Sequence, residues 1–302
     1  MNQYYLRVVA LLAGVAMAGS ASAALSVFAC EPEWASLAQT LGGDNVEVFA
    51  ATTAAQDPHR IEAKPSLVAK MRRADLVICT GAELEIGWLP MLLRQAGNAK
   101  VSEGSPGYFA AAETVDRLDI PDHVDRAMGD MHAAGNPHVF LDPRRIAKIA
   151  VALHEKLVAL DRDHAADYQK LFDAFQNRWQ QAQAKWDQEA APLRNLRVVE
   201  HHQDWRYLFD WLGINVAGSL EPKPGVPPSA GYLAELKAQL EKTPAKVIVR
   251  AAYQEGRPAE WLSEKTGMKI VVLPFTVGGD GNATDLVALF DETLQLLLAA
   301  SK

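Results

Sequence analysis

The chain has 302 residues, a formal net charge of −7 and 49% hydrophobic residues. Nucleic-acid binding needs a basic face, so this excess of acids leads us to expect no nucleic-acid partner. The length fits two globular domains of roughly 100–200 residues each.

The N-terminus has the pattern of a secretory signal peptide. Arg7 precedes the apolar run VVALLAGVAMAG, which is too short to cross a bilayer, and the small residues SASA follow it. We therefore expect residues 1–23 to be removed on export. Because no cysteine stands at the cleavage point, we expect no lipid anchor.

Strand-like and helix-like segments alternate through the rest of the chain, which predicts parallel sheets flanked by helices. The expected strands lie at 25–29, 46–51, 74–80, 197–201, 214–220, 246–251 and 269–275. This pattern predicts an α/β fold with two lobes, each a mostly parallel sheet flanked by helices. We place the N-terminal lobe at 24–160 and the C-terminal lobe at 194–302.

The segment between the lobes, residues 161–193, predicts one long connecting helix. It contains no glycine, and its only proline is Pro192 near the end. Aromatic residues such as Phe172, Trp179 and Trp186 recur at helical spacing among polar residues, as on an amphipathic helix. A break near 161–163, which would give two shorter helices, is the alternative.

The only cysteines, Cys30 and Cys79, each end an apolar strand-like run. In an oxidising compartment they could form a disulfide, and in a core they could equally stay as buried thiols. Two cysteines are too few for a structural zinc site.

Four potential metal ligands lie where loops follow expected strands or enter helices. His59, His202 and Asp280 each come shortly after a strand, and His138 precedes the helix-start pair Asp142-Pro143. Open α/β sheets bind ligands beyond the carboxyl ends of their strands, so residues from both lobes could meet in one cleft. A proline directly before His59 and His138 restricts the backbone and would fix the direction of each ring.

Three imidazoles and a carboxylate form a complete shell for a tetrahedral divalent ion. Asp280 is our fourth ligand, with Asp285 or water as the alternatives. Of the adjacent histidines His201 and His202, only one should point into the cleft. We interpret His132 as a loop residue rather than an accessory ligand.

At these motifs the sequence resembles the periplasmic zinc- and manganese-binding solute-binding proteins of ABC importers, the cluster A-I family. The resembling segments are DPHRIEAKPSLVAKMRRADLVICTGAELEIGWLP, GNPHVFLDPRRIAKIA and VVEHHQDWRYLFDWLGI, which carry His59, His138 and His202. The family's third ligand stands five residues before a tyrosine, so Tyr207 favours His202 over His201. The resemblance implies two lobes joined by one long helix, a membrane permease as partner and no enzymatic activity.

Two features depart from the family pattern. The usual aspartate after the last strand is missing, because Pro274 lies near its place. The histidine-rich loop of many zinc-importing members is reduced, with only His123 and His132 between residues 116 and 135. Members that carry manganese have a carboxylate at the third position, so His202 favours Zn²⁺ over Mn²⁺.

Alternative functions also follow from the same residues. Three histidines and a water could form a zinc hydrolase, although no H-E-x-x-H helix supplies a general base. The histidines could also be incidental in an exported adhesion protein, in which case metal would not change its melting temperature. We expect a monomer, and whether a periplasmic metallochaperone loads the site stays open.

Overall fold

The structure is a computed structural model that describes residues 23–125 and 128–302. The expected signal peptide, residues 1–23, lies outside these ranges except for Ala23. Within them, no helix is both long enough and apolar enough to cross a membrane.

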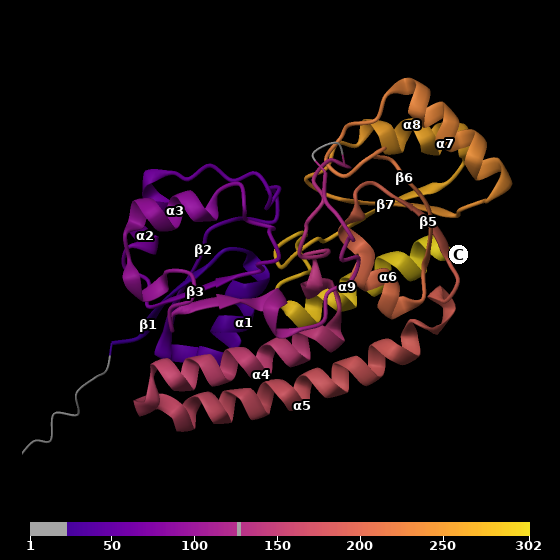
Figure 1. The fold of residues 1–302 in the computed structure, drawn as a ribbon. Coiled ribbons are helices and arrows are strands. Elements are labelled where there is room, and N and C mark those ends of the chain that lie inside the picture. The colour runs from indigo at the N-terminus through magenta and orange to yellow at the C-terminus, as the bar shows by residue number, and fades with distance from the viewer. Residues whose placement is uncertain (1–22, 126–127) are drawn as a thin grey trace, which may run out of the picture.

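The N-terminal lobe is built on a four-stranded parallel sheet with the strand order β2-β1-β3-β4. Its strands are β1 (Leu25–Ala29), β2 (Val46–Ala50), β3 (Leu76–Cys79) and β4 (Tyr108–Ala110). Helices α1 (Pro32–Gly42), α2 (Pro65–Met71) and α3 (Leu89–Ala96) flank it (Figure 1). The sequence did not predict the short edge strand β4, because three residues are too few to show an alternation of polar and apolar side chains.

The C-terminal lobe repeats this architecture with the strand order β6-β5-β7-β8, again all parallel. Its strands are β5 (Arg197–Glu200), β6 (Asn215–Ser219), β7 (Val247–Ala251) and β8 (Lys269–Leu273). Its helices are α6 (Arg206–Leu212), α7 (Ala230–Lys242), α8 (Arg257–Thr266) and α9 (Leu286–Ser301). The predicted fold of two α/β lobes with parallel sheets is therefore confirmed.

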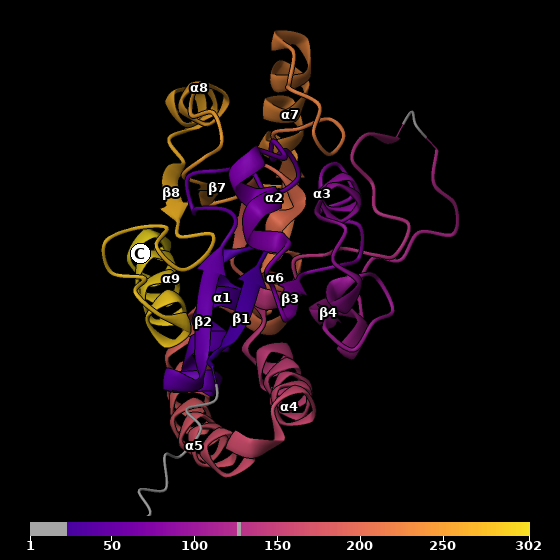
Figure 2. The ribbon, with the colours of Figure 1, turned by 90° about the vertical axis from the view of Figure 1, so that its left-hand side faces the viewer.

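Two antiparallel helices, α4 (Pro143–Leu160) and α5 (Ala165–Glu189), run along one side of the molecule (Figures 1 and 2). Helix α4 lies beneath the N-terminal lobe, and α5 continues from there toward the C-terminal lobe (Figure 1). The long helix starts at Ala165 because Asp161 leaves the helical conformation, with φ −138° and ψ 80°. The Asp161 carboxylate accepts hydrogen bonds from His164 and Tyr168 and so holds the turn between the helices.

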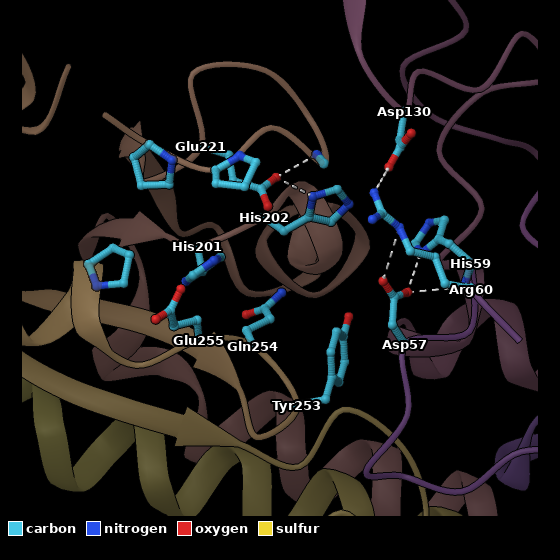
Figure 3. A pocket seen from close by; sticks show the side chains of 14 residues that line it. Asp57, His59, Arg60, Asp130, His201, His202, Glu221, Tyr253, Gln254 and Glu255 are labelled. Atoms are coloured by element: carbon cyan, nitrogen blue, oxygen red, sulfur yellow. Dashed lines mark hydrogen bonds and ion pairs between the residues drawn. The ribbon is translucent and has the colours of Figure 1, made fainter. Parts of the chain in front are cut away.

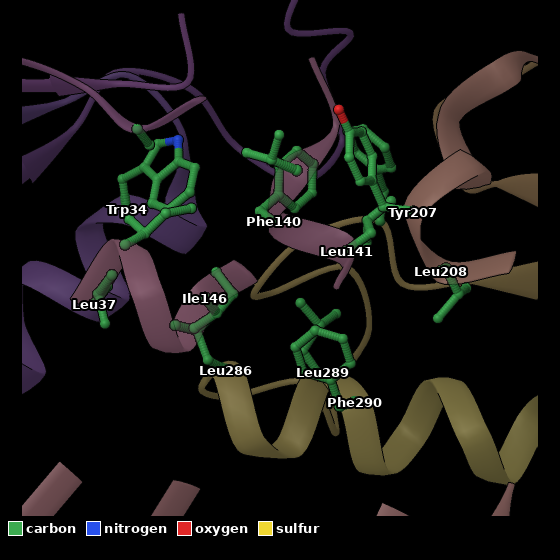
Figure 4. Close-up of a cluster of buried hydrophobic side chains, with 14 of the residues drawn as sticks. Trp34, Leu37, Phe140, Leu141, Ile146, Tyr207, Leu208, Leu286, Leu289 and Phe290 are labelled. Atoms are coloured by element: carbon green, nitrogen blue, oxygen red, sulfur yellow. The ribbon is translucent and has the colours of Figure 1, made fainter. Parts of the chain in front are cut away.

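One continuous hydrophobic core connects the lobes on the side of α4, α5 and α9. It includes Trp34 and Phe140 from the first half of the chain and Tyr207 and Phe290 from the second (Figure 4). The indole of Trp186 in α5 also donates a 2.6 Å hydrogen bond to Asp291 in α9. Because this core fills the space between the lobes, it fixes their relative position on this side.

Cys30 and Cys79 form a disulfide between the ends of β1 and β3, with a Cα–Cα distance of 4.8 Å. Both residues are fully buried. The pairing resolves the alternatives that the sequence left open, and it ties together the two central strands of the N-terminal sheet.

Candidate metal centre

Loops from both lobes carry the three predicted histidines to one place. His59 lies in the loop that follows β2, and the indole of Trp88 donates a 2.9 Å hydrogen bond to the carbonyl of the preceding Pro58. His138 precedes a short 3-10 turn that leads into α4, and His202 lies two residues beyond β5. Parallel strands end at the same edge of a sheet, so these loops converge.

The three imidazole rings lie in mutual contact. Their centroids are 5.6 Å apart for His59 and His138, 5.7 Å apart for His59 and His202, and 6.2 Å apart for His138 and His202. His138 is 1% exposed and His202 is 9% exposed. The structure thus gathers three histidines that are far apart in the sequence.

An oxygen acceptor fixes the orientation of each ring at its Nδ1 atom. Nδ1 of His59 lies 2.8 Å from Asp57, and Nδ1 of His202 lies 2.6 Å from Glu221 (Figure 3). Nδ1 of His138 lies 3.0 Å from Oδ1 of Asn136. Because these oxygens accept, each Nδ1 carries the proton, and in a neutral ring Nε2 is left with a free electron pair.

Two of these three Nε2 atoms lack a hydrogen-bond partner. The Nε2 atoms of both His59 and His138 are buried and unpaired. Buried polar atoms are nearly always satisfied, so a cluster of unpaired imidazole nitrogens calls for another partner. A divalent metal ion accepts electron pairs from neutral imidazoles and is the partner that fits this arrangement.

His132 belongs to the same cluster. Its ring stacks on His59 with a centroid distance of 5.4 Å, and its Nε2 is also buried and unpaired. Together with His138 and His202 it lines a small hollow of about 30 Å³. Our interpretation of His132 as a simple loop residue does not agree with this placement.

Asp280 lies in its own turn rather than beside the imidazoles. Its Oδ1 accepts hydrogen bonds from the backbone N–H groups of Asn282 (2.9 Å) and Ala283 (2.8 Å), and it lines neither hollow at the histidines. The aromatic ring of Phe275 packs against His138 instead, at 5.6 Å. The structure therefore does not bring the expected fourth ligand to the other three.

The alternative, Asp285, has a structural role. Its Oδ1 caps α9 by accepting a 2.8 Å hydrogen bond from Ala288 N–H, and its Oδ2 forms an ion pair with Arg178 of α5. These contacts hold the carboxylate at the helix N-terminus.

The acid that reaches an Nε2 atom of the cluster is Asp204, which our sequence analysis missed. It is fully buried, and its Oδ1 lies 3.5 Å from Nε2 of His138. Tyr253 and Gln254 donate hydrogen bonds to its two oxygens. The sequence could have pointed to Asp204 by its position two residues after His202, on the loop that carries that ligand.

A larger hollow of about 250 Å³ opens onto the cluster and is lined by His59, His202, Asp57, Glu221 and Tyr253, among other residues (Figure 3). His201 also lines it, so both adjacent histidines reach the same hollow, against our expectation. Of these two adjacent histidines, however, His202 is the one that makes ring contacts with His59 and His138 among the described residues.

Burial and charge set the protonation of these rings in different ways. Burial lowers the pKa of His138 well below its usual value and lowers the pKa of His132 to about 4, so both rings are neutral at pH 7. Burial also acts to lower the pKa of His202, but Asp204 and Glu221 outweigh it and raise this pKa to about 9. A metal ion bound at His202 would therefore displace a proton.

The ligand nitrogens of the three histidines lie farther apart than the ligand atoms of a single bound ion do. Among the described residues, only Cys30, Cys79 and Glu85 form a trio of His, Cys, Asp or Glu whose ligand atoms all lie within 4.8 Å of one another. The two sulfurs of that trio are joined as a disulfide, which removes them as metal ligands. Binding at the histidines would thus require small movements of their loops.

Comparison with known proteins agrees with this architecture. Residues 27–300 match the family described as ZnuA, zinc-uptake complex component A, periplasmic. The manganese ABC transporter substrate-binding lipoprotein scaA of Streptococcus gordonii is 24% identical over 259 residues, covering 85% of this chain and 81% of the relative. The zinc-binding lipoprotein AdcA of Streptococcus pneumoniae (strain ATCC BAA-255 / R6) is 26% identical over 240 residues, covering 77% of this chain and 46% of the relative.

Solved structures share the fold. A crystal structure of ZnuA aligns with a TM-score of 0.77 at 21% identity, covering 92% of this chain and 100% of the other. A mutant structure of the laminin-binding adhesin Lmb of Streptococcus agalactiae aligns with a TM-score of 0.76 at 23% identity, covering 92% of this chain and 100% of the other. The chain belongs to the ZnuA family, whose members are non-enzymatic solute-binding proteins of ABC metal importers and work with a membrane permease.

Proposed function

We propose that the chain captures Zn²⁺, in preference to Mn²⁺, between its two lobes and delivers it to an ABC permease. His59, His138 and His202 are the proposed ligands, each through Nε2. The observation that carries the proposal is the contact between imidazole rings from both lobes, in which the Nε2 atoms of His59 and His138 are buried and unpaired. Each proposed ligand is oriented by an oxygen acceptor at Nδ1, as metal-binding histidines generally are.

The preference for zinc rests on the donor atoms. Imidazole nitrogen suits zinc, whereas manganese prefers oxygen ligands. The relatives do not decide the metal, since scaA is named for manganese and AdcA for zinc. A site with three imidazoles at its centre supports zinc.

The mode of capture follows from the shared core. Because α5 and the surrounding hydrophobic residues hold the lobes together, metal binding should rearrange the ligand loops rather than close the lobes about a hinge. The loaded loops would then form part of the surface that the permease recognises.

The proposal extends to the state of the exported protein. We propose a monomer in the periplasm without a lipid anchor, loaded directly or by a metallochaperone. Since scaA and AdcA are both named lipoproteins, the anchor needs its own test. Intact-mass spectrometry of protein from the native host would show an acylated N-terminus if the chain is anchored.

Competition titration against a chromophoric chelator tests the function. The wild-type protein should bind one equivalent of zinc more tightly than manganese. Each of His59→Ala, His138→Ala and His202→Ala should weaken zinc binding by at least about 100-fold, because ligand loss exceeds the 10–100-fold effect of outer contacts. The exposed His123 supplies the control His123→Ala, which should bind as the wild type does. Tighter manganese than zinc binding would overturn the metal assignment.

A further inference from the structure

We propose that Asp204 is the fourth ligand of the metal centre and gives it one oxygen donor and one buried negative charge. The inference rests on the proposed function, since it concerns the same ion. It replaces Asp280 in the expected ligand set with an acid that the β5–α6 loop carries beside His202.

The first argument is the meeting of two electron-pair donors. His138 carries its proton on Nδ1, because that atom faces Oδ1 of Asn136 at 3.0 Å. The Asn136 amide is oriented by a 2.8 Å hydrogen bond from its Nδ2 to the carbonyl of Gln203, which fixes Oδ1 as the acceptor. Nε2 of His138 therefore carries a lone pair, and this atom faces the carboxylate of Asp204. A shared cation turns this unfavourable contact into a favourable one.

The second argument is the distance between these atoms. Zinc binds nitrogen and oxygen ligands at about 2.0–2.2 Å in tetrahedral geometry, which separates two ligand atoms by roughly 3.3–3.5 Å. Oδ1 of Asp204 and Nε2 of His138 are 3.5 Å apart. That separation is long for a hydrogen bond but suits two ligands of one ion.

The third argument is the cost of burying the charge. The Asp204 side chain is 0% exposed, and an isolated buried carboxylate is strongly unfavourable without a counter-charge. Among residues 23–125 and 128–302, the basic side chain within 4.0 Å of its carboxylate is the neutral ring of His138, and no lysine or arginine takes part. Tyr253 and Gln254 hold its oxygens in place but contribute no charge. The His202 ring, whose pKa Asp204 helps to raise, is the positive charge that acts on this carboxylate, and a divalent ion that displaces the His202 proton would replace that charge.

Two other residues compete for this position. Asp280 is engaged by the backbone of its own turn. His132 has an unpaired Nε2, yet among the described residues its ring contact is with His59 alone of the three central histidines. Asp204 is the acid that already stands at ligand spacing from one of the three central histidines.

The test compares Asp204→Asn with Asp280→Asn and His132→Ala. Asparagine keeps the shape of the side chain and can still contact Tyr253 and Gln254, so the metal-free melting temperature should confirm that the fold persists. We expect Asp204→Asn to lower the affinity for zinc at least about 30-fold. The affinity for manganese should fall still further, because manganese depends more on oxygen donors. Asp280→Asn should bind zinc within about threefold of the wild type.

The absorption spectrum of the Co²⁺-substituted protein adds a readout that a purely structural role would not change. Loss of an oxygen ligand should shift the visible bands in Asp204→Asn but not in Asp280→Asn. X-ray absorption on the zinc-loaded wild type provides a measurement without any variant, and it should fit three imidazoles and one carboxylate oxygen.

The outcomes separate this inference from the proposed function. If His138→Ala abolishes zinc binding while Asp204→Asn leaves affinity and the cobalt spectrum unchanged, Asp204 is not a ligand and the function stands. The same holds if the absorption data fit four nitrogens, which would identify His132. If the wild type binds no zinc, the proposed function itself fails.

Discussion

The hydroxyl of Thr276 donates a hydrogen bond to the carboxylate of Glu33, although 243 positions separate the two residues. Glu33 lies in the first turn of α1, and Thr276 follows β8 in the other lobe. Both side chains are buried. This contact joins the lobes close to the metal centre, because the neighbouring Phe275 packs on His138.

The buried carboxyl of Glu33 should make the stability of the protein depend on pH. Burial raises its pKa to about 8, although the hydrogen bond from Thr276 works against the shift. Between the unfolded value of about 4.5 and this raised value, the folded state binds a proton that the unfolded chain does not. The stability that Glu33 contributes is therefore present below pH 4.5 and lost as the pH rises through 8.

Glu33→Gln tests this linkage, because glutamine is neutral at every pH and can still accept from Thr276. Relative to the wild type, the variant should gain stability between pH 5 and pH 8.5. Melting temperatures with a chelator present would measure the difference. Since the other titrating groups are common to both proteins, parallel curves would contradict the assignment.

Zinc should leave the overall dimensions of the protein nearly unchanged. Lys185 and Trp186 of α5 both contact Asp291 in α9, and Trp179 donates a 2.9 Å hydrogen bond to the carbonyl of Pro143. A rigid connector on one side restricts hinge motion. Small-angle scattering with and without zinc should give the same radius of gyration within error, whereas a clear contraction would show that the lobes close.

Glu221 should influence zinc binding without touching the ion. Its Oε2 accepts hydrogen bonds from Nδ1 of His202 and from Gly225 N–H, at 2.6 and 2.7 Å. Glu221→Gln removes the charge that supports this imidazole, so zinc affinity should fall about 10–100-fold. The exposed Glu235 on α7 offers the control Glu235→Gln. Equal affinities for the two variants would argue against the role.

Tyr207 holds the loop that carries His138. Its hydroxyl accepts a 3.0 Å hydrogen bond from Leu118 N–H and donates one of 2.6 Å to the carbonyl of Asn136. Tyr207→Phe would leave both backbone groups without this partner and should cost about 1–3 kcal/mol of unfolding free energy. Urea denaturation would measure this loss, and a free energy unchanged within about 0.5 kcal/mol would refute it.

The sequence predicted the sheets and three of the clustered histidines because both depend on local patterns. Alternating strands and helices predict parallel sheets, and the motifs around His59, His138 and His202 are contiguous. Membership of the ZnuA family confirms the resemblance and the expectation that the chain is not an enzyme, so the hydrolase alternative has no support. The ligand roles themselves stay predictions.

The rest of the site depends on how side chains turn in three dimensions. Asp280 follows a strand at a suitable place, but the backbone N–H groups of its own turn compete for its oxygen. Asp204 reaches His138 only because the turn after β5 directs it inward, and His132 reaches His59 from an irregular loop. The directions in which the Asp204 and His132 side chains point cannot be derived from their spacing along the chain.

Anomalous diffraction at the zinc edge, from crystals grown with one equivalent of zinc, tests the central claim most directly. We expect one strong peak at about 2.0–2.1 Å from Nε2 of each of His59, His138 and His202. A peak elsewhere on the protein, with these three rings turned away from it, would contradict the account.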